Sequence, residues 1–280
     1  MRISGMPDYH DLDVSGEARA AAGRMEARAR APASGALFDY LLSPLLEPAP
    51  RRVLEVGCGT AALARRVAGR LPEATVYATD KSAGMLAAAK GHAEAETLEN
   101  LHLGRWDVLD PASFPFVSAG PFDLVLSSVV VPYLDDRQTA SLVGDLSSRL
   151  APGGVVAFVE QDLQTDSVNY PDFDLLRRVY AKDRRALERT MSLGLRPLLR
   201  EAGLELLPRR SFLWTDEEYG PYTRELLGSI ADAAREAGRI TAAERREWGE
   251  TLDGLAAAGD FYYGLVYHRV AGRRPGVTGS

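Results

Sequence analysis

Short apolar runs alternate with longer helical stretches through the middle of the chain, from residue 51 to residue 160. The runs have the length of buried strands, and each helical stretch is long enough to connect two parallel strands. The expected strands are residues 53–56, 75–79, 101–103, 122–127 and 155–160, and the expected helices are residues 61–71, 82–91 and 137–150. This alternation predicts an α/β fold in which helices cover both faces of a mainly parallel sheet.

The segments on either side of this core are less regular. Helical patterns over residues 17–31 and 36–46 end in a stretch that contains Pro44, Pro48 and Pro50, which indicates a separate N-terminal helical segment, residues 1–48. After residue 160 the chain predicts helices over 173–188, 193–202, 216–237 and 241–258, and strands over 204–213 and 261–270. We expect Gly203 to stop the helix over 193–202. Thr241 and Glu244 are spaced for a capping box at the start of the last helix.

These patterns divide the chain into four parts. Residues 1–48 form the N-terminal helical segment, and residues 49–160 form the core. Residues 161–271 complete the same domain and add helices that we expect to form a cap over a substrate. Residues 272–280 are expected to be a disordered tail.

Composition excludes several classes of protein. The 280 residues are 46% hydrophobic, which suits a soluble globular domain, and the single cysteine, Cys58, excludes an intramolecular disulfide framework. The four histidines are too scattered for a recognisable metal motif, so no metal is expected. A net charge of −6 argues against a nucleic-acid partner. No apolar run reaches the roughly 18 residues of a membrane span, and residues 1–14 lack the apolar region of a signal peptide, so we expect a cytoplasmic protein.

The most informative segment is residues 53–62, where an apolar run leads into Gly57-Cys58-Gly59 and then into a helix. The two glycines permit backbone angles and a closeness of approach that a side chain would prevent. Backbone amides at the start of the following helix would then face an anionic or hydrogen-bonding ligand. A tight connection with no ligand is the alternative.

Acidic residues follow the next two strands. Asp80 ends the second strand, 23 residues after Gly57, where it can accept hydrogen bonds from both hydroxyls of a ribose. The alternative for Asp80 is a cap on the helix that begins at residue 82. Asp107 follows the third strand and could accept a hydrogen bond from an adenine amine, with Val108 supplying a backbone amide. The alternative for Asp107 is a solvated loop acid. The neighbouring Asp110 is a competing candidate for the same role.

These motifs resemble a known family. Glu55-Val56-Gly57-Cys58-Gly59-Thr60, Asp80, residues 122–128 and residues 150–154 are similar to the successive motifs of class I S-adenosylmethionine-dependent methyltransferases. The resemblance covers residues 51–160, and it is nearest to the bacterial small-molecule branch that includes the ubiquinone and menaquinone C-methyltransferases (methyltransferase type 11). It implies a Rossmann-like sheet of seven strands whose last strand is antiparallel, a place that residues 261–270 fit.

The resemblance also implies roles for individual residues in binding S-adenosylmethionine or its product S-adenosylhomocysteine. Glu55, Gly57 and Gly59 would hold the methionine part, Asp80 the ribose, and Asp107 with Val108 the adenine. Ser128 would lie near the sulfonium. Cys58 and Lys81 complete the expected cofactor site, and Met85 either packs on the adenine or belongs to a helix core.

Residues that could act on the acceptor are fewer. The family often has a histidine pair after the fourth strand, where this chain has Val131-Pro132-Tyr133-Leu134. Tyr133 could orient or deprotonate an acceptor, or only form a wall of the pocket. Asp162 follows the fifth strand beside Gln161 and is a candidate base, with a loop cap as the alternative. His10 has a pKa suited to proton transfer, unless it is an ordinary surface histidine.

We therefore expect methyl transfer from S-adenosylmethionine to oxygen, nitrogen or carbon of a small apolar or aromatic metabolite. The basis for an aromatic acceptor is the aromatic content of the segments after residue 160, although helix packing is the simpler explanation for most of these residues. They are Tyr170, Phe173, Tyr180, Trp214, Tyr219, Tyr222 and Trp248. The alternatives are a cyclase that binds the cofactor without transferring its methyl group and a binding module without activity. A nicotinamide dehydrogenase is disfavoured, because it would need a third glycine in the turn, which this chain lacks. Residues 235–246 either form a solvated face or contribute to a homodimer.

Overall fold

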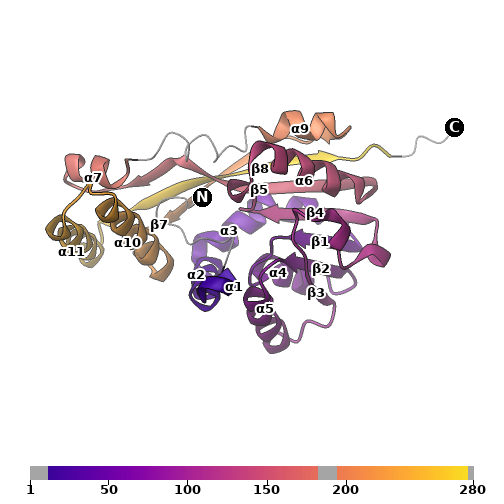
Figure 1. Ribbon diagram of the computed structural model, residues 1–280, viewed down its shortest axis with the longest axis horizontal. Helices are drawn as coiled ribbons and strands as arrows, with labels where there is room; N and C mark the ends of the chain where they lie inside the picture. Colours follow the sequence, from indigo (N-terminus) through magenta and orange to yellow (C-terminus); the bar gives the residue numbers. More distant parts are fainter. Residues whose placement is uncertain (1–11, 182–193, 277–280) are drawn as a thin grey trace.

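A mainly parallel sheet forms the centre of the molecule (Figure 1). The structure is a computed structural model and describes residues 12–181 and 194–276. The strands are β1 (Arg52–Val56), β2 (Thr75–Asp80), β3 (Leu101–Arg105), β4 (Phe122–Ser128), β5 (Leu150–Val168), β6 (Glu205–Leu206), β7 (Arg210–Asp216) and β8 (Tyr263–Arg273). Their order is β3-β2-β1-β4-β5-β8-β6, with β7 also paired to β8. The first five strands are parallel and β8 is antiparallel to β5, which confirms the Rossmann-like arrangement.

Within the described part of the chain the sheet has eight strands, one more than expected. The single strand expected over residues 204–213 is divided into β6 and β7. Pro208 lies between them, and proline has no backbone N–H to donate to a neighbouring strand. Both strands pair antiparallel with β8. The division therefore adds one strand beside β8 and leaves the five parallel strands unchanged.

Helices cover both faces of the sheet, as the alternating pattern predicted. The central helices are α3 (Pro32–Leu41), α4 (Ala62–Arg70), α5 (Ala83–Ala95), α6 (Asp136–Ser148) and α9 (Leu195–Glu201). Side chains of α3, α4 and α5 share one buried cluster with Val53 of β1, whereas side chains of α6 and α9 share the other with Leu54. Alternate residues of a strand point to opposite faces, which is why neighbours in β1 belong to different clusters.

A second group of helices lies at the far end of the two longest strands, β5 and β8 (Figure 1). These are α7 (Phe173–Val179), α10 (Pro221–Glu236) and α11 (Ala242–Ala258). The strand expected to end at residue 160 is longer than predicted: β5 continues to Val168 and there pairs with Tyr263 of β8 after a shift in register. The continued hydrogen bonding to β8 holds a polar segment in strand conformation.

Local signals at helix ends were read correctly. Thr241 and Glu244 form the capping box of α11, with each side chain accepting a hydrogen bond from the other residue's backbone N–H. Gly203 follows the end of α9 with a φ of +77°, the left-handed conformation that glycine adopts without strain. The expectation of a disordered tail from residue 272 is wrong for residues 272–274, because β8 runs to Arg273 and Arg274 exchanges backbone hydrogen bonds with the turn at Gly153 and Gly154. Residues 277–280 lie outside the described residues.

The N-terminal segment contains α1 (Leu12–Ser15), α2 (Ala18–Arg30), α3 and a short 3-10 helix, η1 (Ser43–Leu45). Asp13 attaches α1 to the start of α5: its carboxylate accepts hydrogen bonds from Ser82 Oγ at 2.6 Å, Ala83 N at 2.8 Å and Gly84 N at 3.0 Å. The other 3-10 helices are η2 (Pro111–Ser113), η3 (Val117–Ala119) and η4 (Val131–Tyr133). None of the helices that the structure describes is long and apolar enough to cross a bilayer.

Candidate active site

The turn after β1 has the backbone that its glycines predicted. Gly57 and Gly59 have φ values of +66° and +55°, in the left-handed region where a side chain is costly. Cys58 N donates to Thr79 O at 2.9 Å, which ties the turn to the neighbouring strand β2. The Cys58 side chain is buried, and burial raises the pKa of its thiol well above the usual value, so Cys58 is a packing residue and not a nucleophile.

Glu55 lies near the end of β1 and is almost fully buried. Its Oε2 accepts a hydrogen bond of 2.8 Å from the backbone N–H of Ala64, in the first turn of α4. Burial raises the pKa of Glu55 to about 8, an effect that the Ala64 hydrogen bond only partly offsets. The side chain is therefore mostly protonated at neutral pH.

Asp80 faces the glycine turn from the end of β2. One carboxylate oxygen accepts from Gly59 N at 2.8 Å, and the other accepts from Ser82 N at 2.9 Å. The N-cap of α5 is Ser82 itself, whose side chain accepts from Met85 N. Burial raises the pKa of Asp80, whereas the two backbone hydrogen bonds lower it. Asp80 is therefore not the N-cap itself but holds the residue that is, and it also lines the cavity. Its role toward a ribose stays a prediction.

One cavity of about 910 Å³ runs along the carboxyl ends of the strands, under α1 and α2. Nine of the ten residues expected to bind the cofactor line it: Glu55, Gly57, Cys58, Asp80, Lys81, Met85, Asp107, Val108 and Ser128. Gly59 is the exception, although its N–H donates a hydrogen bond to Asp80, which does line the cavity. Parallel strands bring their carboxyl ends to one edge of the sheet, which is why residues up to 73 positions apart meet here. Their individual roles stay predictions.

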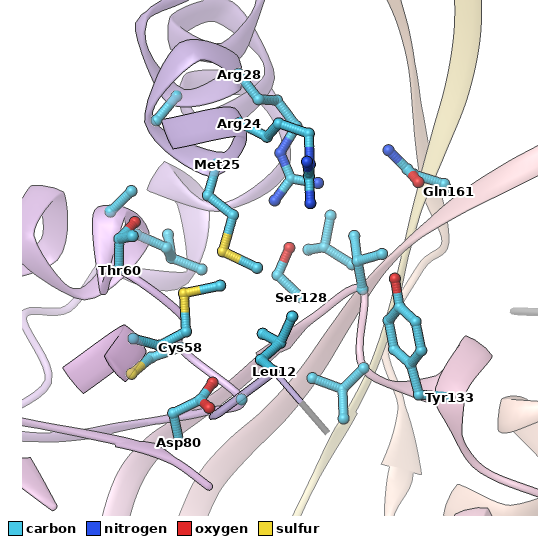
Figure 2. Close-up of a pocket in the computed structure, with 18 of the residues that line it drawn as sticks. Leu12, Arg24, Met25, Arg28, Cys58, Thr60, Asp80, Ser128, Tyr133 and Gln161 are labelled. Atoms are coloured by element: carbon cyan, nitrogen blue, oxygen red, sulfur yellow. The ribbon is translucent and has the colours of Figure 1, made fainter. Parts of the chain in front are cut away.

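Side chains lie close against the glycines of the turn. A Cβ added to Gly59 would lie 2.3 Å from Met25 Sδ, and one added to Gly57 would lie 2.4 Å from Val130 Cγ2. The contact at Gly59 is with a flexible side chain that can move, but the positive φ makes a larger residue strained at both positions. Val129, directly before Val130, has a φ of +55°, a strained conformation for a β-branched residue. Figure 2 shows the Met25 side chain reaching down from α2 toward Cys58.

The structure tests whether this edge suits a nucleoside with an amino-acid tail. Thr60 Oγ1 lines the cavity beside the turn, is buried, and has no hydrogen-bond partner in the described ranges. An unsatisfied buried hydroxyl of this kind is costly unless a ligand or water meets it. The left-handed glycines, the carboxylate of Asp80 and this hydroxyl together fit S-adenosylmethionine. Sequence reasoning missed Thr60 as a site residue, although it belongs to the quoted motif.

The three candidate catalytic residues differ in where they lie relative to the cavity. Tyr133 lines the cavity at the end of η4. Asp162 does not line it: Gln161 points into the cavity, and the next residue of the strand points to the opposite face. There Asp162 Oδ2 lies 3.3 Å from His268 Nε2, and His268 Nδ1 lies 2.7 Å from Ser211 Oγ. This placement argues against Asp162 as the base. His10 lies outside the described residues.

Most of the expected aromatic residues do not reach the cavity. Of the seven, only Tyr222 lines it. Tyr170 and Trp248 stack with ring centroids 4.3 Å apart, Trp214 packs edge-on against Tyr222, and Phe173 is exposed. Packing inside the protein, the alternative to an aromatic pocket, therefore accounts for most of this group.

Two arginines of α2, Arg24 and Arg28, line the cavity, and Figure 2 shows both side chains pointing into it. Sequence analysis did not single them out, because the pattern of residues 17–31 gives no indication of which arginines face a cavity. The distinguishing signal would have been their spacing of four, which places them on one face of a helix. In the ranges that the structure describes, no group of three His, Cys, Asp or Glu side chains is arranged to hold a metal ion.

Comparison with known proteins agrees with this geometry. Residues 53–154 match a family described as "Methyltransferase domain". Over 106 residues the chain is 36% identical to trans-aconitate 2-methyltransferase of Deinococcus radiodurans, covering 38% of this chain and 36% of that protein. Over 118 residues it is 35% identical to malonyl-[acyl-carrier protein] O-methyltransferase of Hahella chejuensis, covering 41% and 38%. The chain thus spans well under half the length of these two curated relatives.

Solved structures share the fold over a larger part of the chain. An O-methyltransferase family protein from Burkholderia thailandensis superposes with a TM-score of 0.50 at 16% identity, covering 84% of this chain and 54% of that one. A protein from Bacillus halodurans superposes with a TM-score of 0.52 at 17% identity, covering 84% and 98%. The family match and the similarity to curated methyltransferases identify residues 53–154 as a methyltransferase domain, and these solved structures share its fold.

Proposed function

We propose that this chain transfers a methyl group from S-adenosylmethionine to a small-molecule acceptor. The observation that carries the proposal is one continuous cavity, which joins the glycine turn and Asp80 to a second region lined by Tyr133 and Gln161. Ser128, at the end of β4, lies between the two regions (Figure 2). One cavity can therefore hold a donor and an acceptor side by side.

S-adenosylmethionine supplies an electrophilic methyl group on a positively charged sulfur. The chain's own residues then have to align the acceptor and exclude water, and no covalent intermediate is needed. Asp80 is placed to accept hydrogen bonds from the ribose, and Thr60 can donate one to the ligand. Leu12 and Met25 cover the cavity from α1 and α2, which shields it from water.

The names of the curated relatives do not identify the acceptor molecule of this chain. Their names refer to trans-aconitate, a carrier-bound malonyl group and demethylmenaquinone, which differ in size and polarity. The sequence-based hypothesis of an apolar or aromatic acceptor loses its main support, because most of the expected aromatic residues are packed inside the protein and only Tyr222 of the seven lines the cavity. The hypotheses of a homodimer and a cytoplasmic location stay predictions. In the segment considered for a dimer contact, Arg245 pairs with Asp232 of the same chain.

Calorimetry with S-adenosylhomocysteine tests the proposal first, and we expect micromolar binding. A folded sample that binds neither S-adenosylhomocysteine nor S-adenosylmethionine would refute it. Transfer of label from methyl-labelled S-adenosylmethionine then distinguishes a methyltransferase from the cyclase and from the inactive binding module, because only a methyltransferase moves the label to another molecule.

A further inference from the structure

Three polar side chains lie side by side on the face of the sheet that is turned away from the cavity. They are Ser211 of β7, His268 of β8 and Asp162 of β5, and β8 is hydrogen-bonded to both of the other strands. Gln161 and Tyr267, the preceding residues of β5 and β8, line the cavity, so Asp162 and His268 point to the opposite face. The three side chains are therefore separate from the site described above.

The hydrogen bonds of His268 determine which ring nitrogen carries the proton. A carboxylate can only accept hydrogen bonds, so the contact of 3.3 Å between Asp162 Oδ2 and His268 Nε2 places the proton on Nε2. Nδ1 can then accept the hydroxyl proton of Ser211, whose Oγ lies 2.7 Å away. Asp162 is held in turn, because its Oδ1 accepts from Gln164 N at 3.1 Å. A nucleophile, a base and a group that orients the base together form the arrangement that activates a serine.

The burial of the three side chains differs in the way that this chemistry requires. Ser211 is exposed, so its hydroxyl is accessible to a reactant. The side chains of His268 and Asp162 are only 17% and 26% exposed, which shields their interaction from water. Glu160 of β5 is the register partner of His268, but burial raises the pKa of Glu160 to about 8, so it is mostly neutral at pH 7 and adds little charge beside the ring.

A backbone N–H group beside Ser211 is placed to stabilise an oxyanion. β7 pairs with β8 on one side, and no other strand in the described parts of the chain pairs with it. Successive residues of an antiparallel strand direct their N–H groups alternately toward the partner strand and away from it. Either Ser211 or the next residue, Phe212, therefore directs its N–H away from β8. Donors of this kind stabilise the negative charge that develops on a carbonyl oxygen under attack.

The surface next to Ser211 is apolar. Leu213 lies two residues further along β7, on the same face, and is 51% exposed. Its register partner in β8 is Val266, which is half-buried. These two side chains form an apolar strip beside the hydroxyl, which suits the alkyl chain of an ester better than a charged group.

We propose that Ser211, His268 and Asp162 form a second catalytic site, which hydrolyses small esters with an aliphatic acyl group. Ser211 Oγ attacks the carbonyl carbon while its proton passes to His268 Nδ1. The bond from that carbon to the alcohol oxygen breaks, and the alcohol leaves with the proton from His268. A water molecule then attacks the acyl-serine and gives a proton to His268; the carboxylic acid leaves, and Ser211 recovers its proton. Asp162 is a positioning residue. The proposal does not depend on the methyltransferase function.

The experiment measures hydrolysis of p-nitrophenyl butyrate by the full chain and its labelling by a fluorophosphonate, with the labelled residue located by mass spectrometry. We expect the label on Ser211. Ser211→Ala should abolish the labelling, and His268→Gln should lower both rates about a hundredfold, a usual contribution of a positioned base. Asp162→Asn should lower both rates about tenfold or more, because an amide N–H donates to Nε2 and shifts the ring proton to Nδ1. Asp162→Glu keeps the carboxylate and should restore part of the rate.

Ser167→Ala and His102→Gln are the matched controls, and both should behave like the wild type. Ser167 is an exposed serine of β5 whose Oγ donates to Gly264 O at 3.3 Å, and His102 is an exposed histidine of β3. Thermal unfolding followed by circular dichroism verifies that each variant is folded. The proposal is overturned if the fluorophosphonate does not label Ser211 of the wild type, or if Ser211→Ala hydrolyses the ester at the wild-type rate. Neither result affects the proposed methyltransferase function, which binding of S-adenosylhomocysteine tests separately.

Discussion

Asp80 shows how one carboxylate can serve both the fold and a ligand. It accepts hydrogen bonds from Gly59 N and Ser82 N, and it lines the cavity where a ribose is expected. We predict that Asp80→Ala weakens binding of S-adenosylhomocysteine by about 1.5–3 kcal/mol, the value of charge-assisted hydrogen bonds to the ribose. Calorimetry at constant pH and salt measures the change.

Asp123 provides a control for that variant. Its Oδ2 accepts from Arg51 N and Arg52 N, both at 2.9 Å, so it also holds two backbone amides, but it does not line the cavity. Asp123→Ala should lower stability and leave the affinity for S-adenosylhomocysteine unchanged. Equal losses of affinity in both variants would mean that Asp80 acts through the backbone alone.

Glu160 is a buried carboxyl at the end of the predicted fifth strand. Burial raises its pKa to about 8, against a smaller lowering by the backbone N–H groups of Val131 and Val130. Between its usual pKa of 4.5 and about 8 the folded state holds a proton that the unfolded state has released. This contribution to stability is complete below pH 4.5 and is lost as the pH rises through about 8.

Glu160→Gln keeps the side chain neutral at every pH. We predict that the unfolding free energy of the variant, relative to the wild type, increases from about pH 5 to about pH 8, by at most about 1.4 kcal/mol per pH unit. Urea unfolding at several pH values measures this difference. Glu99→Gln, at an exposed position, is the control, and a difference that is flat with pH for Glu160→Gln would contradict the buried, protonated state.

At the scale of elements, α1 is joined to α5 by Asp13. Hydrogen bonds from Ser82, Ala83 and Gly84 lower the pKa of Asp13, so this attachment stabilises the protein above the usual pKa of an aspartate and is lost in acid. We predict that Asp13→Ala costs about 1 kcal/mol of stability, as for other helix caps, and accelerates the dissociation of S-adenosylhomocysteine, because Leu12 of α1 covers the cavity. Stopped-flow fluorescence measures the dissociation rate.

The capping box of α6 gives the matching control. Asp135 accepts from Gln138 N at 2.8 Å, and no residue of this capping box lines the cavity. Asp135→Ala should lower stability by a similar amount with no change in the dissociation rate. If both variants release the ligand at the wild-type rate, α1 does not act as a cover.

Elements were predictable where their signals are local. The caps of α11 and α9 depend on residues within one turn, and both were identified from the sequence. The continuation of β5 to Val168 was not, because a polar segment becomes a strand there only through hydrogen bonds to β8, about 100 residues later in the chain. The placement of Arg24 and Arg28 likewise depends on how α2 packs over the sheet edge.

At the scale of the whole molecule, the sheet and the helices beyond it share one core. Val53 of β1, Leu227 of α10 and Trp248 of α11 belong to the same buried cluster. Trp248 is fully buried, and its Nε1 donates to Leu227 O at 3.2 Å. We predict that Trp248→Ala lowers the unfolding free energy by about 3–5 kcal/mol and that unfolding stays a single transition. Urea unfolding followed by circular dichroism and by cofactor binding tests both.

Phe173→Ala is the control, since this aromatic side chain of α7 is 72% exposed. Its effect on the unfolding free energy should stay within about 0.5 kcal/mol. Two separate transitions in the wild type would show that the helices beyond the sheet unfold independently, contrary to the shared core.

The sequence by itself determined the parallel sheet, the glycine turn and the acidic residue that faces it, because hydrophobic period, backbone freedom and strand ends are properties of short segments. The tertiary structure decided which side chains share the cavity. It turned Gln161 inward and Asp162 outward, packed the expected aromatic residues among helices, and brought Arg24 and Arg28 of the N-terminal segment over the carboxyl edge of the sheet. These placements depend on packing between segments far apart in the chain, which no local pattern encodes.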